Sequence, residues 1–286
     1  METIKDNSFR LNLTRMGGKT NSSFHMEFNG SSVALRIPGK GTENYICRDA
    51  EAEILQILTN KNIAANVCFF DKSSGLLLTE FLDGYVTLTP EAFNSNELLE
   101  KAMTLLKKVH QIQEPFPSTF HPAVIVKKFD ELIKLKQISL SNIGEYCREY
   151  AEDFLVRIDW GKLSMANCHC DLLANNFMYN EITGDLRLID WEYGGRSFVL
   201  YDLADFAVDK NFSESRENAM LSYYFSSAIG EEEVTTFQMF KVISDYLWGL
   251  WALIQYADKD ESYLYDYSTF RFERCRENIN QFEMVV

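Results

Sequence analysis

The sequence predicts an α+β fold in which a small β-rich lobe precedes a larger, mainly helical lobe. Apolar residues alternate with polar ones in three segments before residue 40, as they do in half-buried strands. The dipeptide Asn29-Gly30, between the second and third segments, favours a tight hairpin. From about residue 90 onward, apolar residues recur at the spacing of amphipathic helices. We therefore expect two domains, residues 1–85 and 86–286, with a linker near 82–90.

The first domain is predicted to be an antiparallel sheet with one helix. A helix is expected at residues 48–60, because Ile54, Leu55 and Leu58 fall on one helical face. Short apolar or alternating segments predict the strands. These lie at residues 9–13, 24–28, 33–37, 67–70 and 76–81.

The second domain is predicted to be helical apart from one β-hairpin. The hairpin would pair residues 177–179 with 186–189 around a turn that contains Gly184. No other part of this domain has a β-like pattern. Prolines interrupt the chain between residues 115 and 122. Helices are expected within residues 98–110, 123–157, 199–228, 231–257 and 263–284.

The composition is that of a soluble globular protein and disfavours several classes of function. A net charge of -14 argues against a nucleic-acid partner, which needs a basic surface. The charge suits either simple solubility or attraction of a cationic ligand. The chain starts with a polar segment and has no apolar run of roughly 18 residues, so we expect no signal peptide, no membrane insertion and a cytoplasmic location. Six cysteines without C-x-x-C spacing indicate free thiols rather than a zinc site.

One segment carries the strongest chemical signal. Asp171 precedes Asn176 by five residues, and Asp190 lies beyond the predicted hairpin, which would return it to the end that carries Asn176. Two acids and an amide placed this way can hold Mg²⁺ against a nucleotide while a substrate hydroxyl attacks. An isolated aspartate more often caps a helix or turn. The three residues together indicate a phosphoryl-transfer centre with Asp171 as base and Asn176 and Asp190 as metal ligands.

The segments His169-Cys170-Asp171-Leu172 to Asn176 and Ile189-Asp190-Trp191-Glu192-Tyr193 resemble those of the choline/ethanolamine kinase family. The pattern is most similar to bacterial choline kinases, within the aminoglycoside-phosphotransferase and protein-kinase-like superfamily, and covers about residues 10–280. The resemblance implies a bilobal protein-kinase-like fold. It also implies ATP, Mg²⁺ and a small-molecule substrate, with choline kinase activity in a monomer or homodimer. Ethanolamine, thiamine and aminoglycosides are the alternative acceptors.

Two other interpretations are disfavoured. A catalytically silent nucleotide- or amine-binding module would be expected to lack the base or a metal ligand, and all three residues are present. A protein kinase would carry D-F-G and A-P-E elements, whereas this chain has Ile189-Asp190-Trp191-Glu192 in place of the first and lacks the second.

The resemblance implies nucleotide contacts in the first domain. Arg36 takes the place of the basic residue that contacts the phosphates, and its planar donor fork suits them. Glu51 is the expected ion-pair partner of Arg36, with Glu53 as the competing choice. A glycine-containing turn at residues 17–21 would cover the phosphates, although an ordinary hairpin turn would show the same sequence pattern. The remaining expected nucleotide contacts are Gly18, Lys19, Thr20 and Asn21 in this turn, and Glu80 and Leu82 in the hinge that receives adenine.

The acceptor pocket is predicted from Trp248 and Trp251, which share a helical face because they lie three residues apart. Two indole faces attract a quaternary ammonium group, although such pairs usually belong to a core. The resemblance favours the pocket. It places Asp209 near the ammonium, where the family more often has the longer Glu. The other expected substrate contacts are Asp171, Glu192, Tyr193 and Tyr267, with Tyr265 as the alternative to Tyr267.

Two residues near the motif are expected to support it without taking part in the chemistry. His169 would hold the loop by packing and hydrogen bonding. Asp202 resembles the aspartate that braces the catalytic loop in the family.

Overall fold

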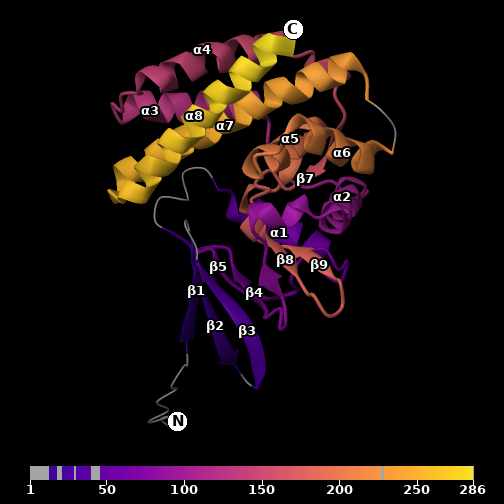
Figure 1. Cartoon of the computed structure of the whole chain (residues 1–286). Helices are drawn as coiled ribbons and strands as arrows, with labels where there is room; N and C mark the ends of the chain where they lie inside the picture. The colour runs from indigo at the N-terminus through magenta and orange to yellow at the C-terminus, as the bar shows by residue number, and fades with distance from the viewer. Residues whose placement is uncertain (1–12, 18–20, 29, 40–45, 227–228, 286) are drawn as a thin grey trace.

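The computed structural model describes residues 13–17, 21–28, 30–39, 46–226 and 229–285, which form the two predicted lobes. Strands β1 to β5 form the N-lobe sheet, and α3, α4, α7 and α8 lie together on the far side of the C-lobe (Figure 1). Between them are α1, α2, α5 and α6 and the short strands β6 to β10. The α+β bilobal fold class is therefore confirmed.

The N-lobe sheet is antiparallel, with strand order β1-β2-β3-β5-β4. Gly30 has a φ of +76°, which favours glycine, and lies directly before β3, as the hairpin prediction requires. Asn29, the other residue of the predicted turn, lies outside the described residues. The strands are β1 (Leu13–Gly17), β2 (Ser22–Phe28), β3 (Ser31–Ile37), β4 (Val67–Asp71) and β5 (Leu76–Glu80). The predicted helix is α1 (Arg48–Leu58), which buries Ile54, Leu55 and Leu58.

The C-lobe is built around α7 (Glu231–Lys259), which is buried over most of its length and contacts α3, α4, α5 and α8. A helix that is apolar on nearly every face has to be covered on all sides. The other helices of this lobe are α2 (Asn96–His110), α3 (Pro122–Leu135), α4 (Asn142–Arg157), α5 (Val199–Asp209), α6 (Glu214–Phe225) and α8 (Ser262–Val285). Short 3-10 helices cover Pro90–Asn94, Trp160–Lys162, Ala174–Asn176 and Trp191–Tyr193. No helix within the described residues is long and apolar enough to span a bilayer.

One expectation for the C-lobe was wrong. The lobe contains a second pair of strands, β7 (Met165–Cys168) with β10 (Gly195–Phe198), besides the predicted hairpin. Each strand has only four residues and is largely buried, so neither shows alternation. The helical segments predicted at 123–157 and 199–228 are each made of two helices, and the chain leaves α5 through Asn211, which has a φ of +49°. The hairpin itself, β8 (Phe177–Tyr179) with β9 (Leu186–Leu188), is extended by β6 (Val86–Thr87).

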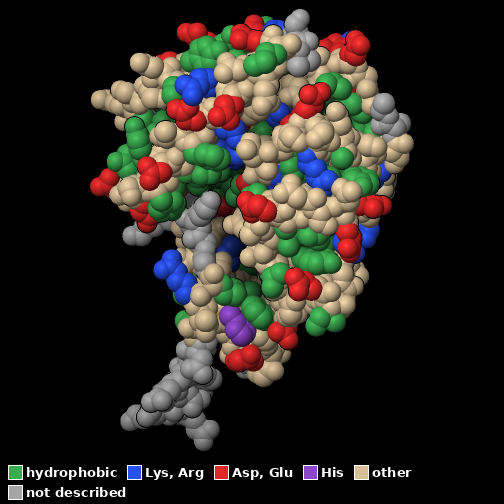
Figure 2. Space-filling view, viewed as in Figure 1, with side chains coloured by type: hydrophobic (Ala, Val, Ile, Leu, Met, Phe, Trp, Pro, Cys, Tyr) green, Lys and Arg blue, Asp and Glu red, His purple; other side chains and the backbone are tan. Residues whose placement is uncertain are grey.

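The surface carries the negative charge as scattered acidic side chains. On the face seen in Figure 2, Asp and Glu side chains are spread over the C-lobe with Lys and Arg side chains set among them. Among the described residues of this face, no basic surface of the kind that contacts phosphate backbones stands out.

Close packing of α7 against α8 makes Gly249 a sensitive position. A Cβ atom at Gly249 would lie 2.6 Å from Cε1 of Phe272. We expect Gly249→Ala to destabilise the protein by about 1–3 kcal/mol through overpacking, although the helix preference of alanine offsets part of this loss. Urea denaturation measures the change. Gly161→Ala is the matched control, because its nearest contact would be 3.4 Å, and we expect a change within about 0.5 kcal/mol. Equal stability of Gly249→Ala and the wild type would contradict the packing argument.

Candidate active site

The hairpin places Asn176 and Asp190 side by side, as its pattern predicted. Phe177 is paired with Leu188, and the Ile189 N–H donates to the Asn176 carbonyl at 2.9 Å. Asp190 has a φ of +65°, a strained conformation for a residue other than glycine that often occurs at functional sites. The two predicted metal ligands therefore leave the sheet at the same end.

Asp171 lies beside Asn176 and is buried. The Asn176 amide Nδ2 donates to the Asp171 carbonyl at 2.9 Å and lies 3.4 Å from Asp171 Oδ2. Burial raises the pKa of Asp171 well above its ordinary value, and the carboxylates of Asp205 and Asp190 raise it further. A cation bound nearby would lower this pKa, because it stabilises the charged form.

Asp202 braces residues 169–176, which are called the catalytic loop because they carry the predicted base. Its two carboxylate oxygens accept the backbone N–H groups of His169 and Cys170 at 3.2 and 2.7 Å. Cys170 has a φ of +65°, so the loop turns sharply just before Asp171. The carboxylate of Asp202 therefore satisfies two buried donors and fixes this turn.

His169 supports the loop in the way the sequence suggested. Its Nδ1 accepts the Asp171 N–H at 3.3 Å, and its Nε2 lies 2.9 Å from the Ile189 carbonyl. Nε2 must therefore carry the proton. Burial lowers the pKa of His169, which keeps the ring neutral between the loop and the hairpin.

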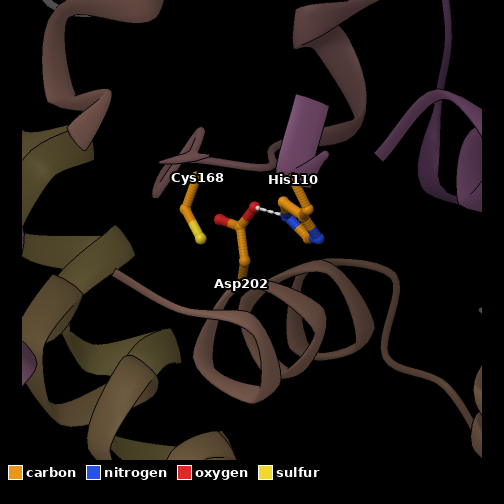
Figure 3. A group of neighbouring side chains, drawn as sticks. All are labelled: His110, Cys168 and Asp202. Carbon is orange, nitrogen blue, oxygen red and sulfur yellow. Dashed lines mark hydrogen bonds and ion pairs between the residues drawn. The ribbon is translucent and has the colours of Figure 1, made fainter. Parts of the chain in front are cut away.

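Among the described residues, His110, Cys168 and Asp202 form a cluster whose possible ligand atoms lie within 4.8 Å of one another (Figure 3). The sequence did not indicate this proximity. The His110 ring nitrogens already face Asp202 Oδ2 at 3.0 Å and the Tyr224 hydroxyl at 2.7 Å. Burial raises the pKa of the Cys168 thiol well above its ordinary value, and Asp202 adds to the shift. Since a metal needs a thiolate and open lone pairs, the cluster fits a brace for the loop better than a metal site.

Arg36 connects the two lobes through charge. It forms an ion pair with Glu51, and its Nη1 lies 3.0 Å from Asp190 Oδ1. Glu51 is thus the partner of Arg36, whereas Glu53 is exposed. Arg48 extends the network to Glu51 at 2.8 Å, and sequence analysis did not single it out.

Glu192 is the C-lobe end of the same network. Its Oε2 accepts the Asn21 amide at 3.1 Å and lies 3.3 Å from Arg48 Nη1. Burial and the neighbouring Asp190 raise the pKa of Glu192 to about 7. Asn21 also accepts the Gly39 N–H at 3.3 Å, so it joins the first hairpin to the strand that carries Arg36.

A cavity of about 430 Å³ brings most of the predicted residues together. It lies between the lobes and is open to solvent. Predicted site residues in its wall are Asn21, Arg36, Glu80, Leu82, Asp171, Asn176, Asp190, Glu192, Tyr193, Trp248, Trp251 and Tyr267. Such a mixture of apolar wall and a few polar groups is typical of small-molecule sites.

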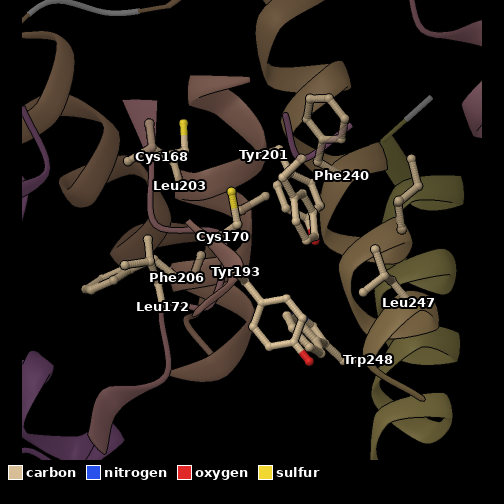
Figure 4. Packing of buried hydrophobic residues seen from close by; sticks show 14 of the residues in the cluster. Cys168, Cys170, Leu172, Tyr193, Tyr201, Leu203, Phe206, Phe240, Leu247 and Trp248 are labelled. Carbon is tan, nitrogen blue, oxygen red and sulfur yellow. The ribbon is translucent and has the colours of Figure 1, made fainter. Parts of the chain in front are cut away.

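Aromatic rings form part of this wall. Trp248 makes edge-to-face contacts with Trp251 and Tyr193, with ring centroids 5.9 and 5.1 Å apart. In Figure 4 the ring of Tyr193 lies against that of Trp248, beside the buried side chains that follow the catalytic loop. Tyr267 lines the cavity, whereas Tyr265 is 49% exposed. The position of Tyr267 in the wall makes it the better candidate of the two.

Several predicted residues do not line the cavity or lie outside the described part of the chain. Glu51 is set back behind Arg36. Asp209 accepts the Ala174 N–H at 2.8 Å, beside the catalytic loop, and does not line the cavity. Gly18, Lys19 and Thr20 lie outside the described residues.

Sequence analysis missed Asp205 and Lys210, although both touch the catalytic loop. Asp205 accepts the Leu172 N–H at 2.8 Å, and Lys210 donates to the Leu172 carbonyl. The spacing of Asp202, Asp205 and Asp209 is three and then four residues, which places them on one face of a helix. That spacing was the available signal.

Comparison with known proteins agrees with this geometry. Residues 14–220 match the choline/ethanolamine kinase family. Ethanolamine kinase 1 of Mus musculus is 29% identical over 285 residues, which cover 85% of this chain and 76% of that protein. A choline/ethanolamine kinase family protein from Mesorhizobium loti superimposes with a TM-score of 0.79 at 28% identity, covering 95% of this chain and 89% of that one.

The fold also matches the choline kinase LicA of Streptococcus pneumoniae, with a TM-score of 0.83 at 24% identity over 96% of this chain and 95% of that one. The family match spans well over half of the sequence and includes Asp171, Asn176 and Asp190. The chain belongs to the choline/ethanolamine kinase family.

Proposed function

We propose that this protein is an ATP-dependent choline kinase, which transfers the γ-phosphoryl group of ATP to the choline hydroxyl and yields phosphocholine and ADP. The observation that carries the proposal is the composition of the cavity wall. The wall contains Arg36, Asp171, Asn176 and Asp190 as well as an aromatic group that includes Trp248. A phosphoryl-transfer centre and a cation-binding surface therefore share one space.

ATP is assigned to the part of the cavity that the N-lobe lines. Adenine would lie against the hinge residues 79–82, and Arg36 and Asn21 are placed to contact the phosphates. Gly18, Lys19 and Thr20 are proposed as further phosphate contacts. A structure of LicA in complex with AMP has the same fold, with a TM-score of 0.82 at 24% identity, which agrees with nucleotide binding by this chain.

Mg²⁺ fits the donor set that Asn176 and Asp190 provide. The Asn176 Nδ2 atom faces Asp171, so its Oδ1 is the atom left for a cation. Asp190 Oδ1 accepts from Arg36. Among the described residues, no side chain or backbone group donates a hydrogen bond to its second oxygen, Oδ2. Oxygen atoms of amides and carboxylates are the ligands that Mg²⁺ prefers. When bound, the ion would neutralise charge on the phosphates.

Asp171 is proposed as the base. Its carboxylate would accept the hydroxyl proton while the substrate oxygen bonds to the γ-phosphorus and the bond from that phosphorus to the bridging oxygen of ADP breaks. A positioned base contributes about 10²- to 10⁴-fold to such a reaction. The side chains of His169 and Asn176 bind the backbone N–H and carbonyl of Asp171, and so hold the residue that carries the carboxylate in place.

A quaternary ammonium group suits the aromatic wall better than a primary one. Asp205, which lies behind the aromatic wall and does not line the cavity, already accepts from Leu172, Ser244 and Trp248, at 2.7 to 2.9 Å. Asp209 is likewise engaged. A primary ammonium group carries three N–H donors that need acceptors, whereas a trimethylammonium group has none and is attracted by ring faces.

A panel of acceptors tests the proposal. We expect turnover of ATP with Mg²⁺ to be fastest with choline, compared with ethanolamine, thiamine and kanamycin. Faster turnover with ethanolamine would replace choline by the substrate named for the Mus musculus relative. Absence of turnover with every acceptor would overturn the proposed activity.

The substitution Trp251→Ala separates recognition of the amine from packing. Loss of one aromatic face costs roughly 0.5–2 kcal/mol of cation binding. We therefore expect the KM for choline to rise about tenfold and the KM for ATP to stay within about twofold. Steady-state kinetics with each substrate varied measures both. Trp160→Ala is the matched control, because Trp160 packs on Phe198 and Phe240 away from the cavity. An equal rise of both constants would indicate a packing role for Trp251.

A further inference from the structure

Lys210 is a lysine whose ammonium group lies beneath the catalytic loop, out of contact with solvent. Its side chain is 0% exposed. The Nζ atom lies 4.0 Å from the ring centre of Phe206 and 5.1 Å from the ring centres of Phe93 and Phe177. Burying an ammonium ion costs several kcal/mol, and an apolar side chain of similar shape would fill such a space with less penalty. Stability alone therefore does not explain why a charged residue occupies this position.

The polar contacts of Lys210 lead to the segment that follows Asp171. Nζ donates to the Leu172 carbonyl and lies 3.3 Å from Asp209 Oδ2. The same oxygen of Asp209 accepts the Ala174 N–H at 2.8 Å. One ion pair thus holds a carbonyl and an N–H on two nearby peptide groups of the loop.

Asp202 and Asp205 complete this arrangement from the same helix. They accept the N–H groups at positions 169, 170 and 172. Helix α5 therefore binds the loop with carboxylates from its first turn to its last residue, and Lys210, the residue that caps its C-terminus, adds a cation to them. Without the lysine, the Leu172 carbonyl would lose a charged donor in a dry environment.

The pKa shifts of Lys210 and Asp209 agree with an ion pair in which both side chains are charged. Burial lowers the pKa of Lys210, and Asp209 and Asp205 oppose this shift. Burial alone would raise the pKa of Asp209, but Lys210 and Arg271 outweigh it, so the pKa of Asp209 is lowered overall. Asp209 is thus satisfied by Lys210 and the loop.

We propose that Lys210 is a positioning residue, which acts with Asp209 to fix the peptide groups after Asp171 and so aims the carboxylate of Asp171. The inference rests on the proposed function in that Asp171 is taken as the base. It gives Asp209 a role in holding the loop, in place of direct contact with the amine.

The first test compares Lys210→Met with Lys241→Met. Lys241 is a matched control, because it is also a buried lysine in an ion pair, 2.6 Å from Glu217, with both side chains 4% exposed. A displacement of about 1 Å at a reacting group can cost 10²-fold in rate. We expect Lys210→Met to lower kcat about 100-fold while each KM stays within about threefold. Lys241→Met should lose stability without losing kcat. Wild-type kcat in folded Lys210→Met would overturn the proposal.

Hydrogen exchange tests the same inference without an acceptor substrate. We expect amides in residues 171–176 to exchange faster in Lys210→Met, while the rest of the chain keeps its wild-type protection. Unchanged exchange in this segment would overturn the proposal. Because this readout needs no turnover, a wrong substrate assignment and a wrong role for Lys210 give different results.

Asp209→Asn is the second variant in case Lys210→Met does not fold. Asparagine keeps an oxygen for the Ala174 N–H but removes the charge that pairs with Lys210. We expect kcat to fall at least tenfold with an amine KM within about threefold. A raised amine KM with unchanged kcat would show that Asp209 contacts the amine, and would overturn the proposal.

Discussion

Asp171→Asn is expected to lower kcat at least about 1000-fold, the largest effect of any substitution considered for this chain. Asparagine has nearly the same shape and leaves the backbone contact between Asn176 and the Asp171 carbonyl in place. It cannot accept the hydroxyl proton. Nucleotide binding should therefore persist while phosphoryl transfer stops. Steady-state kinetics and nucleotide titration measure the two effects separately.

The same substitution is expected to stabilise the folded protein near neutral pH. Burial and neighbouring carboxylates raise the pKa of Asp171 in the folded state. Ionising this carboxyl therefore costs free energy above its unfolded pKa of about 4. Below that pH the group is protonated in both states, so the gain from asparagine should disappear in acid. Thermal unfolding at several pH values measures this.

Asp202→Asn is the matched control for stability. The carboxylate of Asp202 accepts two backbone N–H groups in the loop and faces His110. Its loss should destabilise the protein, in contrast to the loss of the Asp171 charge. An Asp171→Asn variant that turns over like the wild type would remove Asp171 from the role of base.

Asp190→Asn is expected to lower kcat at least about 100-fold and to raise the Mg²⁺ concentration needed for half-maximal rate, because one ligand charge is lost. Asparagine tolerates the left-handed backbone at this position, where φ is +65°. The effect should therefore come from charge and not from strain. Rates measured over a range of Mg²⁺ concentrations test this, because loss of ligand charge changes the Mg²⁺ requirement and backbone strain alone does not.

Asp185→Asn provides the control at the opposite end of the same hairpin. Asp185 accepts from Tyr85 and Arg187 and lies at the turn. We expect this variant to keep wild-type kcat and the wild-type requirement for Mg²⁺. An equal loss in both variants would mean that the hairpin, and not the Asp190 carboxylate, sets the rate.

The sequence predicted those parts of the molecule that depend on local pattern. The return of Asp190 to Asn176 follows from the hairpin, and the shared face of Trp248 and Trp251 follows from helical spacing. The strands β7 and β10 could not be predicted, because a strand of four residues is too short to show a periodic pattern. The break after α5 depends on a single residue with positive φ, Asn211.

The partners of the loop lie beyond what spacing can predict. The face of α5 formed by Asp202, Asp205 and Asp209 can be read from the sequence, but which backbone groups it meets depends on tertiary packing. The position of Lys210 also depends on tertiary packing. Its burial among three phenylalanine rings cannot be inferred from its charge. The network from Arg48 to Glu192 likewise joins residues 144 positions apart.

The carboxylates gathered around the cavity also affect the release of the product. Asp171, Asp190 and Glu192 line the space, and Asp205 and Asp209 lie just behind the loop. An amine acceptor enters this region as a cation and is attracted by it. Phosphorylation adds two negative charges to the same molecule, so the field that drew the substrate in repels the phosphoryl end of the product. If the proposed activity holds, we expect the acidic wall to favour departure of the product over its retention.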